Sequence, residues 1–527
     1  MSILASIRRP FPTSFMTLAW SAFGICGMAL IVAGAAGDDP VDPAKKASPA
    51  PEDKCTVKAP VAPAEAPAGF ESETNGFIEL KADFEKDRGA FEQTETVAEG
   101  LGPVYNATSC VACHQNPVTG SSSQIAEIRA GRTIPDPNDP SPRKVKFVEP
   151  LHGSVIHQRA IEPKFQEFVK PEYNVRTLRM SNTILGDGFI EVIPDCEILK
   201  IKKAQRAFGM EGFAVVVTAA VGTEKPATCD SVDEFIQVER IGRFGWKCQE
   251  ASLLNFSAGA YVVEMGITSP LHPQESHSTG MTKPLEDKKC DPEGKKPAEV
   301  HPFGVDVEAF TRFMRSTKVP PRDTVLAATP DAVAGEKLFR NNQALGCAIC
   351  HHPDYTTPPA GTPIETLGGK RGSDMATVHE KLGNKIIHPY SDFLLHDIGT
   401  GDGIAQTQHA NLPSKGYEKR DKIPDATKKS EGLVRVKATA DPEQSNRRVL
   451  EGDFDLDQQL EQRIANKMRT APLWGLRVRP QLMHDGLSLT IDEAIRRHHG
   501  QAEGVRLKYE GLSDTQRKQL LAFLNSL

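Results

Sequence analysis

The sequence predicts a mainly α protein with two domains, each organised around one Cys-X-X-Cys-His motif, and with β-hairpins and long loops added to the N-terminal domain. Three observations carry this prediction. The motif occurs at Cys110–His114 and again at Cys347–His351. Helix signals frame the second copy, whereas short apolar runs bounded by Gly and Pro follow the first. A chain of 527 residues is long enough for two or three cores.

The motif itself is the attachment signal for c-type haem. Two thiols three positions apart add to the vinyl groups, and the histidine that follows binds the iron. We therefore expect two covalently attached haems, with His114 and His351 as iron ligands, bound through Cys110, Cys113, Cys347 and Cys350. A zinc site would require two distant pairs to meet, and a thioredoxin-like redox pair would not require the histidine.

The N-terminal segment 1–36 reads as a signal peptide. Arg8 and Arg9 precede an apolar run over residues 15–32, and small residues follow at 33–36. A run of this length can also span a bilayer, so an uncleaved membrane anchor is the alternative. The sequence thus predicts export to the periplasm, free or anchored to the inner membrane. Residues 37–69 are rich in Pro, Ala and charge and predict a disordered tether.

An exported protein can form disulfides. Besides Cys26 and the four motif cysteines the chain has Cys55, Cys196, Cys229, Cys248 and Cys290. One or two bridges are expected among the last four, with Cys55 unpaired, and the connectivity is left open.

The N-terminal haem domain is expected at 70–320. Residues 116–142, rich in Ser, Pro and Asp, predict a surface loop, and 145–197 predict hairpins. Residues 231–266 predict mostly helix. The charged loop 268–301 carries His272, His277 and His301, whose spacing favours solvated surface over a metal site.

The C-terminal cytochrome c domain is expected at 321–527. Thr329 as N-cap and Pro330 at the first helical position predict a helix through Phe339. Ser513 and Gln516 form a capping box for a last helix with a leucine-rich face. In a cytochrome c fold these two helices cross. The polar stretch 399–455 between them predicts a long exposed insertion.

Several segments resemble the di-haem cytochrome c peroxidase superfamily, and within it the branch of di-haem oxidoreductases, also called thiol oxidoreductases. They are GLGPVYNATSCVACH, GFIEVIPD, IGRFGWK, VVEMGIT, PYSDFLLHDIG and RTAPLWGLRVRPQLMHDGLSLTIDEAIRRHHG, and they touch most of the chain from residue 100 to 527. The resemblance implies two cytochrome c-like haem domains. It alone suggests a structural calcium ion.

In these relatives the last segment supplies the second axial ligand of the C-terminal haem, usually a methionine. The equivalent position, 14 residues after His484, is His498. The residues agree, because Thr490 and Glu493 make a capping box and Gly500 is a suitable C-cap, which puts His498 in the last helical turn. An imidazole in place of the thioether predicts a lower reduction potential. A surface histidine is the alternative.

Two further histidines, His396 and His484, are expected to line the second haem pocket without binding iron.

The resemblance also assigns roles at the first haem. Relatives carry Trp, Gln and Glu-Met there, and Trp246, Asn255 and Glu264 fall at similar, slightly shorter spacing, with Asn in place of Gln. Glu264 would move a proton between the two peroxide oxygens, and Trp246 would relay electrons. Glu191, a carboxyl in an apolar run, is a second candidate acid because burial would raise its pKa. An ordinary surface carboxylate and a core tryptophan are the alternatives.

Two functions remain open at this point. The first is a peroxidase-like enzyme that takes peroxide or another small oxidant and receives electrons from a small donor protein or a quinone-linked donor. The second is a di-haem electron-transfer protein without catalysis. A formal charge of −6 gives no electrostatic reason to expect nucleic acid, and a membrane is a partner only if the N-terminal segment stays uncleaved.

Overall fold

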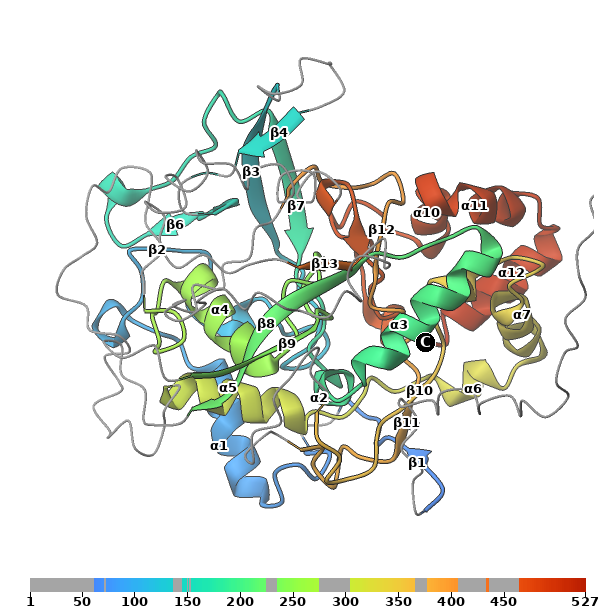
Figure 1. Ribbon diagram of the computed structural model, residues 1–527, viewed down its shortest axis with the longest axis horizontal. Coiled ribbons are helices and arrows are strands. Elements are labelled where there is room, and N and C mark those ends of the chain that lie inside the picture. Colours follow the sequence, from blue (N-terminus) through green and yellow to red (C-terminus); the bar gives the residue numbers. More distant parts are fainter. Residues whose placement is uncertain are drawn as a thin grey trace, which may run out of the picture. The chain divides into compact units, whose positions relative to one another are not determined.

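Helices and several small β-sheets share the chain, so the fold is mixed α and β rather than mainly α (Figure 1). The computed structural model describes residues 61–70, 73–135, 145–148, 150, 153–223, 235–273, 304–364, 377–405, 433–435 and 464–527. The segment 1–36, most of the predicted tether, Cys55, Cys229, Cys290, His277 and His301 lie outside these ranges. Within them, no helix is both long and apolar enough to cross a membrane.

The first sheet is built on β3 (Ala126–Pro135), which pairs antiparallel with β4 (Val145–Val148), β5 (Val155–Ile156) and β7 (Val175–Met180). The surface loop predicted for 116–142 is therefore wrong over β3, where Ala130 is fully buried against Ile156. The strand was missed because Ser- and Pro-rich residues flank it, although its side chains alternate with a period of two. A short ladder joins β2 (Val104–Tyr105) to β6 (Arg159–Ala160).

The strands predicted within 145–197 are present as β4 to β7, but they pair with β2 and β3 rather than with one another as hairpins, and the prediction fails beyond β7. Residues 187–205 form the helices α2 (Asp187–Glu191) and α3 (Asp195–Gln205). Pro194 precedes α3 and acidic residues occupy its first turn, a helix-start pattern that the apolar run obscured.

The centre of the fold combines a sheet with three helices. Strand β8 (Ala214–Thr223) pairs antiparallel with β9 (Phe235–Ile241) and parallel with β13 (Leu433–Arg435). The helix predicted for 231–266 is therefore wrong over β9 and confirmed for α4 (Leu253–Met265), which Ser252 caps. Helix α5 (Val305–Ser316) packs against α4 on one side and against α1 (Lys81–Glu92) on the other, with the Phe91 and Phe313 ring centroids of α1 and α5 5.0 Å apart.

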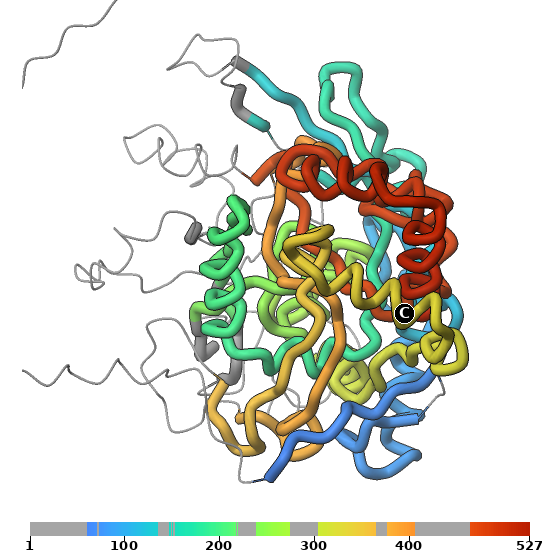
Figure 2. The backbone as a smooth tube through the Cα atoms, turned by 90° about the vertical axis from the view of Figure 1, so that its right-hand side faces the viewer, coloured from blue at the N-terminus to red at the C-terminus, as the bar shows by residue number. Residues whose placement is uncertain are grey.

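The C-terminal helices are α6 (Thr324–Ala327), α7 (Pro330–Arg340), α10 (Ile491–Arg496), α11 (Glu503–Glu510) and α12 (Asp514–Leu524). The Thr329 cap and the Ser513–Gln516 capping box are confirmed. Helices α7 and α12 lie side by side (Figures 1 and 2), with the Phe339 and Phe523 ring centroids 5.1 Å apart. A Cβ atom on Gly335 would stand 2.0 Å from the Gln519 carbonyl oxygen, so glycine is required at this crossing.

Gly335→Ala should therefore destabilise the protein by about 1–3 kcal/mol, because the two helix backbones must move apart. Thermal unfolding measures the effect. Gly504→Ala is the matched control, since a Cβ there meets nothing within 4 Å and alanine favours the helix by about 0.5–1 kcal/mol. Equal stability of the Gly335→Ala and wild-type proteins would contradict the close crossing.

Two segments predicted as exposed or disordered are part of the folded structure. Strand β1 (Ala64–Glu65) pairs parallel with β11 (Lys385–Ile387), which also pairs with β10 (Tyr355–Thr356), so the tether prediction is wrong for residues 64–65. The exposed insertion prediction fails at residues 402–405. Asp402, Ile404 and Ala405 are buried there, and Ile404 and Ala405 pack with Phe147 of β4. Strand β12 (Leu395–His396) pairs antiparallel with β14 (Met468–Arg469).

One continuous hydrophobic core extends from Ala66 through Leu253 and Phe310 to Trp474. A second core, which includes Phe339, Tyr390 and Phe523, lies among the C-terminal helices. The domain boundary at 320/321 stays a prediction.

Candidate functional site

The first Cys-X-X-Cys-His motif forms a short 3₁₀ turn at Cys110–Ala112, where the Ser109 hydroxyl accepts a hydrogen bond from the Ala112 N–H at 3.2 Å. The following imidazole is oriented by the backbone. Nδ1 of His114 donates to the Ser121 carbonyl oxygen at 3.1 Å, which leaves Nε2 as the ring's lone-pair donor. The ring of Phe91 on α1 lies 6.2 Å from the imidazole.

The second motif repeats this arrangement. Cys347–Ile349 is again a 3₁₀ turn, Nδ1 of His351 donates to the Tyr390 carbonyl oxygen at 3.1 Å, and Phe339 on α7 lies 6.4 Å from the imidazole. Burial lowers the pKa of His351 to about 4, so its ring is neutral, as a metal ligand must be.

His498 stands opposite His351. The two ring centroids are 6.3 Å apart, and Nδ1 of His498 donates to the Ala494 carbonyl oxygen at 2.8 Å. An imidazole nitrogen lies about 2 Å from a metal that it binds, so two rings on opposite sides of one ion have centroids roughly 6 Å apart. The donor set and its spacing fit a haem iron between the two rings.

The local prediction at His498 needs a correction. The capping box of Thr490 and Glu493 is confirmed, but α10 ends at Arg496 and its C-cap is Arg497. His498 therefore lies just beyond the helix, and Gly500 begins a separate 3₁₀ turn. An ion pair between Arg497 and Asp485, at 2.5 Å, joins this turn to the His-Asp-Gly segment.

None of the four motif cysteines forms a disulfide, so all four sulfurs are available for thioether bonds. Cys350 also lies beside His396, whose Nδ1 is 3.8 Å from the sulfur and whose Nε2 is 2.7 Å from Asp392 Oδ2. These three side chains offer ligand atoms within 4.8 Å of one another. Because Cys350 is the second cysteine of the second motif, His396 lies at the same site.

A pair of carboxyls lies beside the first motif. Glu264, in the last turn of α4, accepts a hydrogen bond from Asn106 Nδ2 at 2.9 Å, and its side chain also hydrogen-bonds to Glu127 on β3. Burial and then the neighbouring Glu127 raise the pKa of Glu264 to about 8. Both carboxyls also contribute to the raised pKa of the Cys113 thiol, after burial itself, which places them near that attachment position.

Arg129 makes the pKa of Glu127 differ from that of Glu264. Its Nε and Nη2 donate to Glu127 at 2.9 and 3.1 Å. Burial alone would raise the pKa of Glu127, but the Arg129 charge and hydrogen bonds outweigh it and the pKa is lowered. At neutral pH the pair therefore holds one proton, on Glu264. Glu127 was not predicted as a site residue, because it lies on β3, which the sequence analysis assigned to a loop. The alternation of Glu127 and Arg129 was the one sign in the sequence of a strand with both side chains on the same face.

Trp246 and Asn255 are not gathered around Glu264. The Trp246 indole donates to the Met180 carbonyl oxygen at 2.7 Å, and its ring meets that of His484 edge-on at 6.0 Å. Asn255 is completely buried on α4. Nine residues separate it from Glu264, which on a helix corresponds to about half a turn of rotation and roughly 13 Å of rise. The two side chains therefore face opposite sides of α4.

Glu191 is a structural ion-pair residue. Arg315 donates to both of its carboxylate oxygens, at 2.7 and 2.9 Å, and the Leu253 N–H donates to Oε1 at 2.8 Å. The expectation that burial raises its pKa is wrong, because Arg315 and these hydrogen bonds outweigh burial and lower the pKa.

Glu191→Gln should therefore cost about 3–5 kcal/mol of stability, because Arg315 loses its charge partner. If the protein has the expected peroxidase-like activity, its rate per folded, haem-loaded molecule should stay that of the wild type. Chemical denaturation followed by circular dichroism gives the first quantity and a peroxide assay the second. A variant of normal stability with little activity would return Glu191 to the catalytic candidates.

The remaining predictions concern cysteines and one loop histidine. Cys196 is disulfide-bonded, whereas Cys248 is a buried free thiol that donates to the Phe393 carbonyl oxygen at 3.3 Å. His272, expected on solvated surface, is buried in a tight turn with Ser269.

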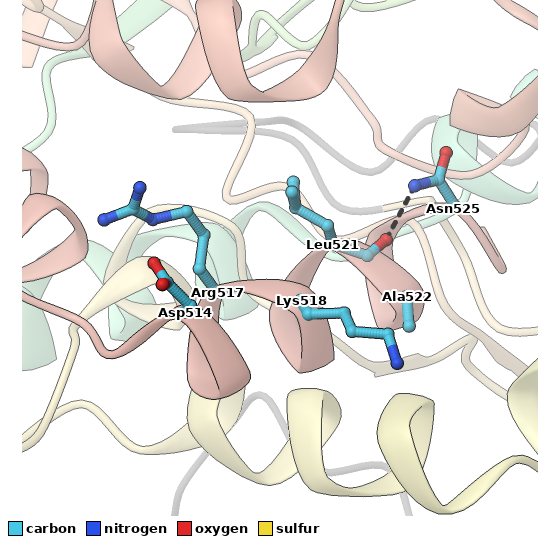
Figure 3. Close-up of a pocket in the computed structure, with 6 residues that line it drawn as sticks. All are labelled: Asp514, Arg517, Lys518, Leu521, Ala522 and Asn525. Atoms are coloured by element: carbon cyan, nitrogen blue, oxygen red, sulfur yellow. Dashed lines mark hydrogen bonds between the residues drawn. The ribbon is translucent and has the colours of Figure 1, made fainter.

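A shallow hollow of about 420 Å³ lies on the outer face of α12 (Figure 3). The side chains of Arg517 and Lys518 point to different sides of it. A second hollow, of about 450 Å³, lies on α7. Neither is lined by any residue of the two motifs or by Glu264.

Comparison with known proteins identifies the family of this chain. The model of a family described as "Di-haem oxidoreductase, putative peroxidase" matches residues 168–422 and 451–527, more than half of the chain, and the match includes the second motif, Glu264 and His498. No curated protein matches. Among solved structures, a hydrazine synthase chain from Kuenenia stuttgartiensis is 16% identical over 42% of this chain and 55% of that one, with a TM-score of 0.20. The protein belongs to the di-haem oxidoreductase family.

Proposed function

We propose that the protein is an exported c-type di-haem oxidoreductase that reduces peroxide at its N-terminal haem. Haem 1 is held by Cys110, Cys113 and His114, and haem 2 by Cys347, Cys350, His351 and His498. The proposal rests on a difference between the surroundings of the two motifs. His351 has an imidazole opposite it at 6.3 Å, whereas a carboxyl pair with one proton lies beside the first motif.

His351 and His498 would together hold haem 2, which would then supply an electron store rather than a site for a substrate. The hydrogen bonds from both Nδ1 atoms to backbone carbonyls fix the rings in place. The close crossing of α7 and α12 at Gly335 supports a cytochrome c-like fold around this haem.

Haem 1, when bound, supplies the iron at which peroxide is reduced. Glu264 takes a proton from one peroxide oxygen and returns it to the other, for which it must be deprotonated at the start. Glu127 and Asn106 hold the Glu264 carboxyl in position. Two electrons and two protons convert one hydrogen peroxide to two waters, and a small donor protein or quinone-linked donor supplies the electrons.

Trp246 is the proposed relay between the two haems. It joins the Met180 carbonyl on β7 to the His484 ring in the C-terminal region, so it spans the junction between the two halves. Asn255 has no role in this proposal, because it faces away from Glu264.

The test is spectroscopy of the purified haem-loaded protein with and without hydrogen peroxide. The proposal expects two covalent haems, one low-spin with two imidazoles and one that reacts with peroxide. Two low-spin haems that do not respond to peroxide would instead make the protein an electron-transfer module. Absence of covalent haem would overturn both readings.

A further inference from the structure

Three buried or half-buried hydrogen-bond donors close to one another in sequence lack an anionic partner. Arg469 on β14 donates from Nε to the Gly245 carbonyl oxygen at 2.7 Å, and Arg479 donates from Nη2 to the Trp474 carbonyl oxygen at 2.8 Å. The indole Nε1 of Trp474 and Nε of Arg479 are buried without a hydrogen-bond acceptor among the described residues. We call Arg469, Trp474 and Arg479 the donor cluster.

The donor cluster lies between the supports of the two motif histidines. The Leu473 N–H donates to the Pro389 carbonyl oxygen at 2.8 Å, directly before Tyr390, whose carbonyl holds His351. On the other side, Asn116, two residues after His114, donates from Nδ2 to the Val478 carbonyl oxygen at 3.3 Å.

The Trp474 ring makes a second connection toward the first motif. It packs against Gly186, where an added Cβ would meet it at 3.0 Å. Ile184, two residues earlier, donates its N–H to the Gly120 carbonyl oxygen at 2.9 Å, next to Ser121, which holds His114. The segment 469–479 therefore touches the surroundings of both imidazoles.

Such a cluster needs an anion. Guanidinium groups stay charged in proteins, and a buried charge without a partner costs several kcal/mol. Within the described part of the chain, neither Arg469 nor Arg479 forms an ion pair with a carboxylate, although the charges of Asp187 and Asp392 act on Arg469. Asp392 is already paired with His396 at 2.7 Å. Burial raises the pKa of Asp187 itself to about 7, so it is an incomplete counter-ion.

We propose that the donor cluster binds carboxylate, and that the carboxylates are haem propionates. Thioether bonds consume the two vinyl groups of a c-type haem, which leaves two propionates as its charged groups. Arginine forms paired hydrogen bonds with a carboxylate, and the free indole N–H adds a third donor. The inference rests on the proposed haem attachment and is independent of peroxide reduction.

Arg469→Gln, Arg479→Gln and Trp474→Phe in the haem-loaded protein test it. Loss of a positive charge beside a propionate favours ferric over ferrous iron, so the midpoint potential of at least one haem should fall in both arginine variants. The propionate bending band in the resonance Raman spectrum should shift in all three. Arg→Lys at either position should restore part of the potential.

Arg477→Gln is the matched control, because Arg477 is exposed and its guanidinium lies over the Phe70 ring at 5.4 Å. The Arg477→Gln substitution should change neither the midpoint potentials nor the propionate Raman band. Trp474→Phe keeps a large ring in the core and removes the N–H, so it serves if an arginine variant fails to fold. Wild-type potentials and Raman bands in the folded variants would overturn the proposal.

Formate separates propionates from a free carboxylate. If wild-type potentials change with added formate while the propionate band is insensitive to the three substitutions, the cluster binds a free anion and the propionate assignment fails. A protein that shows the expected shifts but does not reduce peroxide would refute the proposed enzyme activity and retain this inference.

Discussion

Glu264→Gln should lower the proposed rate of peroxide reduction by about 10²–10⁴-fold, because an amide cannot accept the proton that must move between the peroxide oxygens. Stopped-flow absorbance at the haem bands measures the rate. Glu250→Gln is the matched control. Burial alone raises the pKa of Glu250 to about 8, so this variant removes a similar buried carboxyl that plays no part in the proposal. Equal losses in both variants would point to a general effect on folding.

The same carboxyl sets the pH dependence. Glu264 acts deprotonated and its pKa is raised to about 8, so the rate should rise with pH up to that region and then level off. Glu127→Gln removes the neighbouring negative charge and should move the rise to lower pH. An unchanged profile in Glu127→Gln would show that the two carboxyls do not share a proton.

His498→Met raises the midpoint potential of haem 2 by an amount on the order of 0.1 V, since axial ligands set haem potentials over a range of about 0.8 V and a thioether favours the ferrous state. The bis-imidazole low-spin signal in the EPR spectrum should disappear. His499→Ala is the control, because His499 is exposed and pairs with Glu503 at 2.9 Å. Persistence of the bis-imidazole signal in His498→Met would remove His498 from the iron.

Features that depend on a few neighbouring residues could be predicted from the sequence. The caps at Thr490 and Ser513 follow from residue types three apart, and the cap at Thr329 follows from the proline after it; all three are present. The opposition of His498 to His351 came from a resemblance in spacing, and the rings do face each other. What failed was the exact end of α10, where His498 lies in the turn after the helix.

Features that depend on distant partners could not be predicted. The lowered pKa of Glu191 is due to Arg315, 124 residues later in the chain. Asn255 and Glu264 shared a motif in sequence, yet a spacing of nine places them on opposite faces of one helix. Glu127 reaches Glu264 only because β3 forms part of a sheet, and a single sequence does not show which strands meet.

The hydrogen bonds that orient His114 and His351 close loops of different length. His114 donates to a carbonyl 7 residues later, and His351 to one 39 residues later. Closing the longer loop costs about 1.5 kcal/mol more conformational entropy, from the logarithmic dependence on loop length. The first imidazole is thus oriented by its own short loop, whereas the second acquires its orientation only when Tyr390 has docked against it. In the proposed function, the haem that stores electrons therefore depends on more of the fold for the orientation of its ligand than the haem that reacts with peroxide.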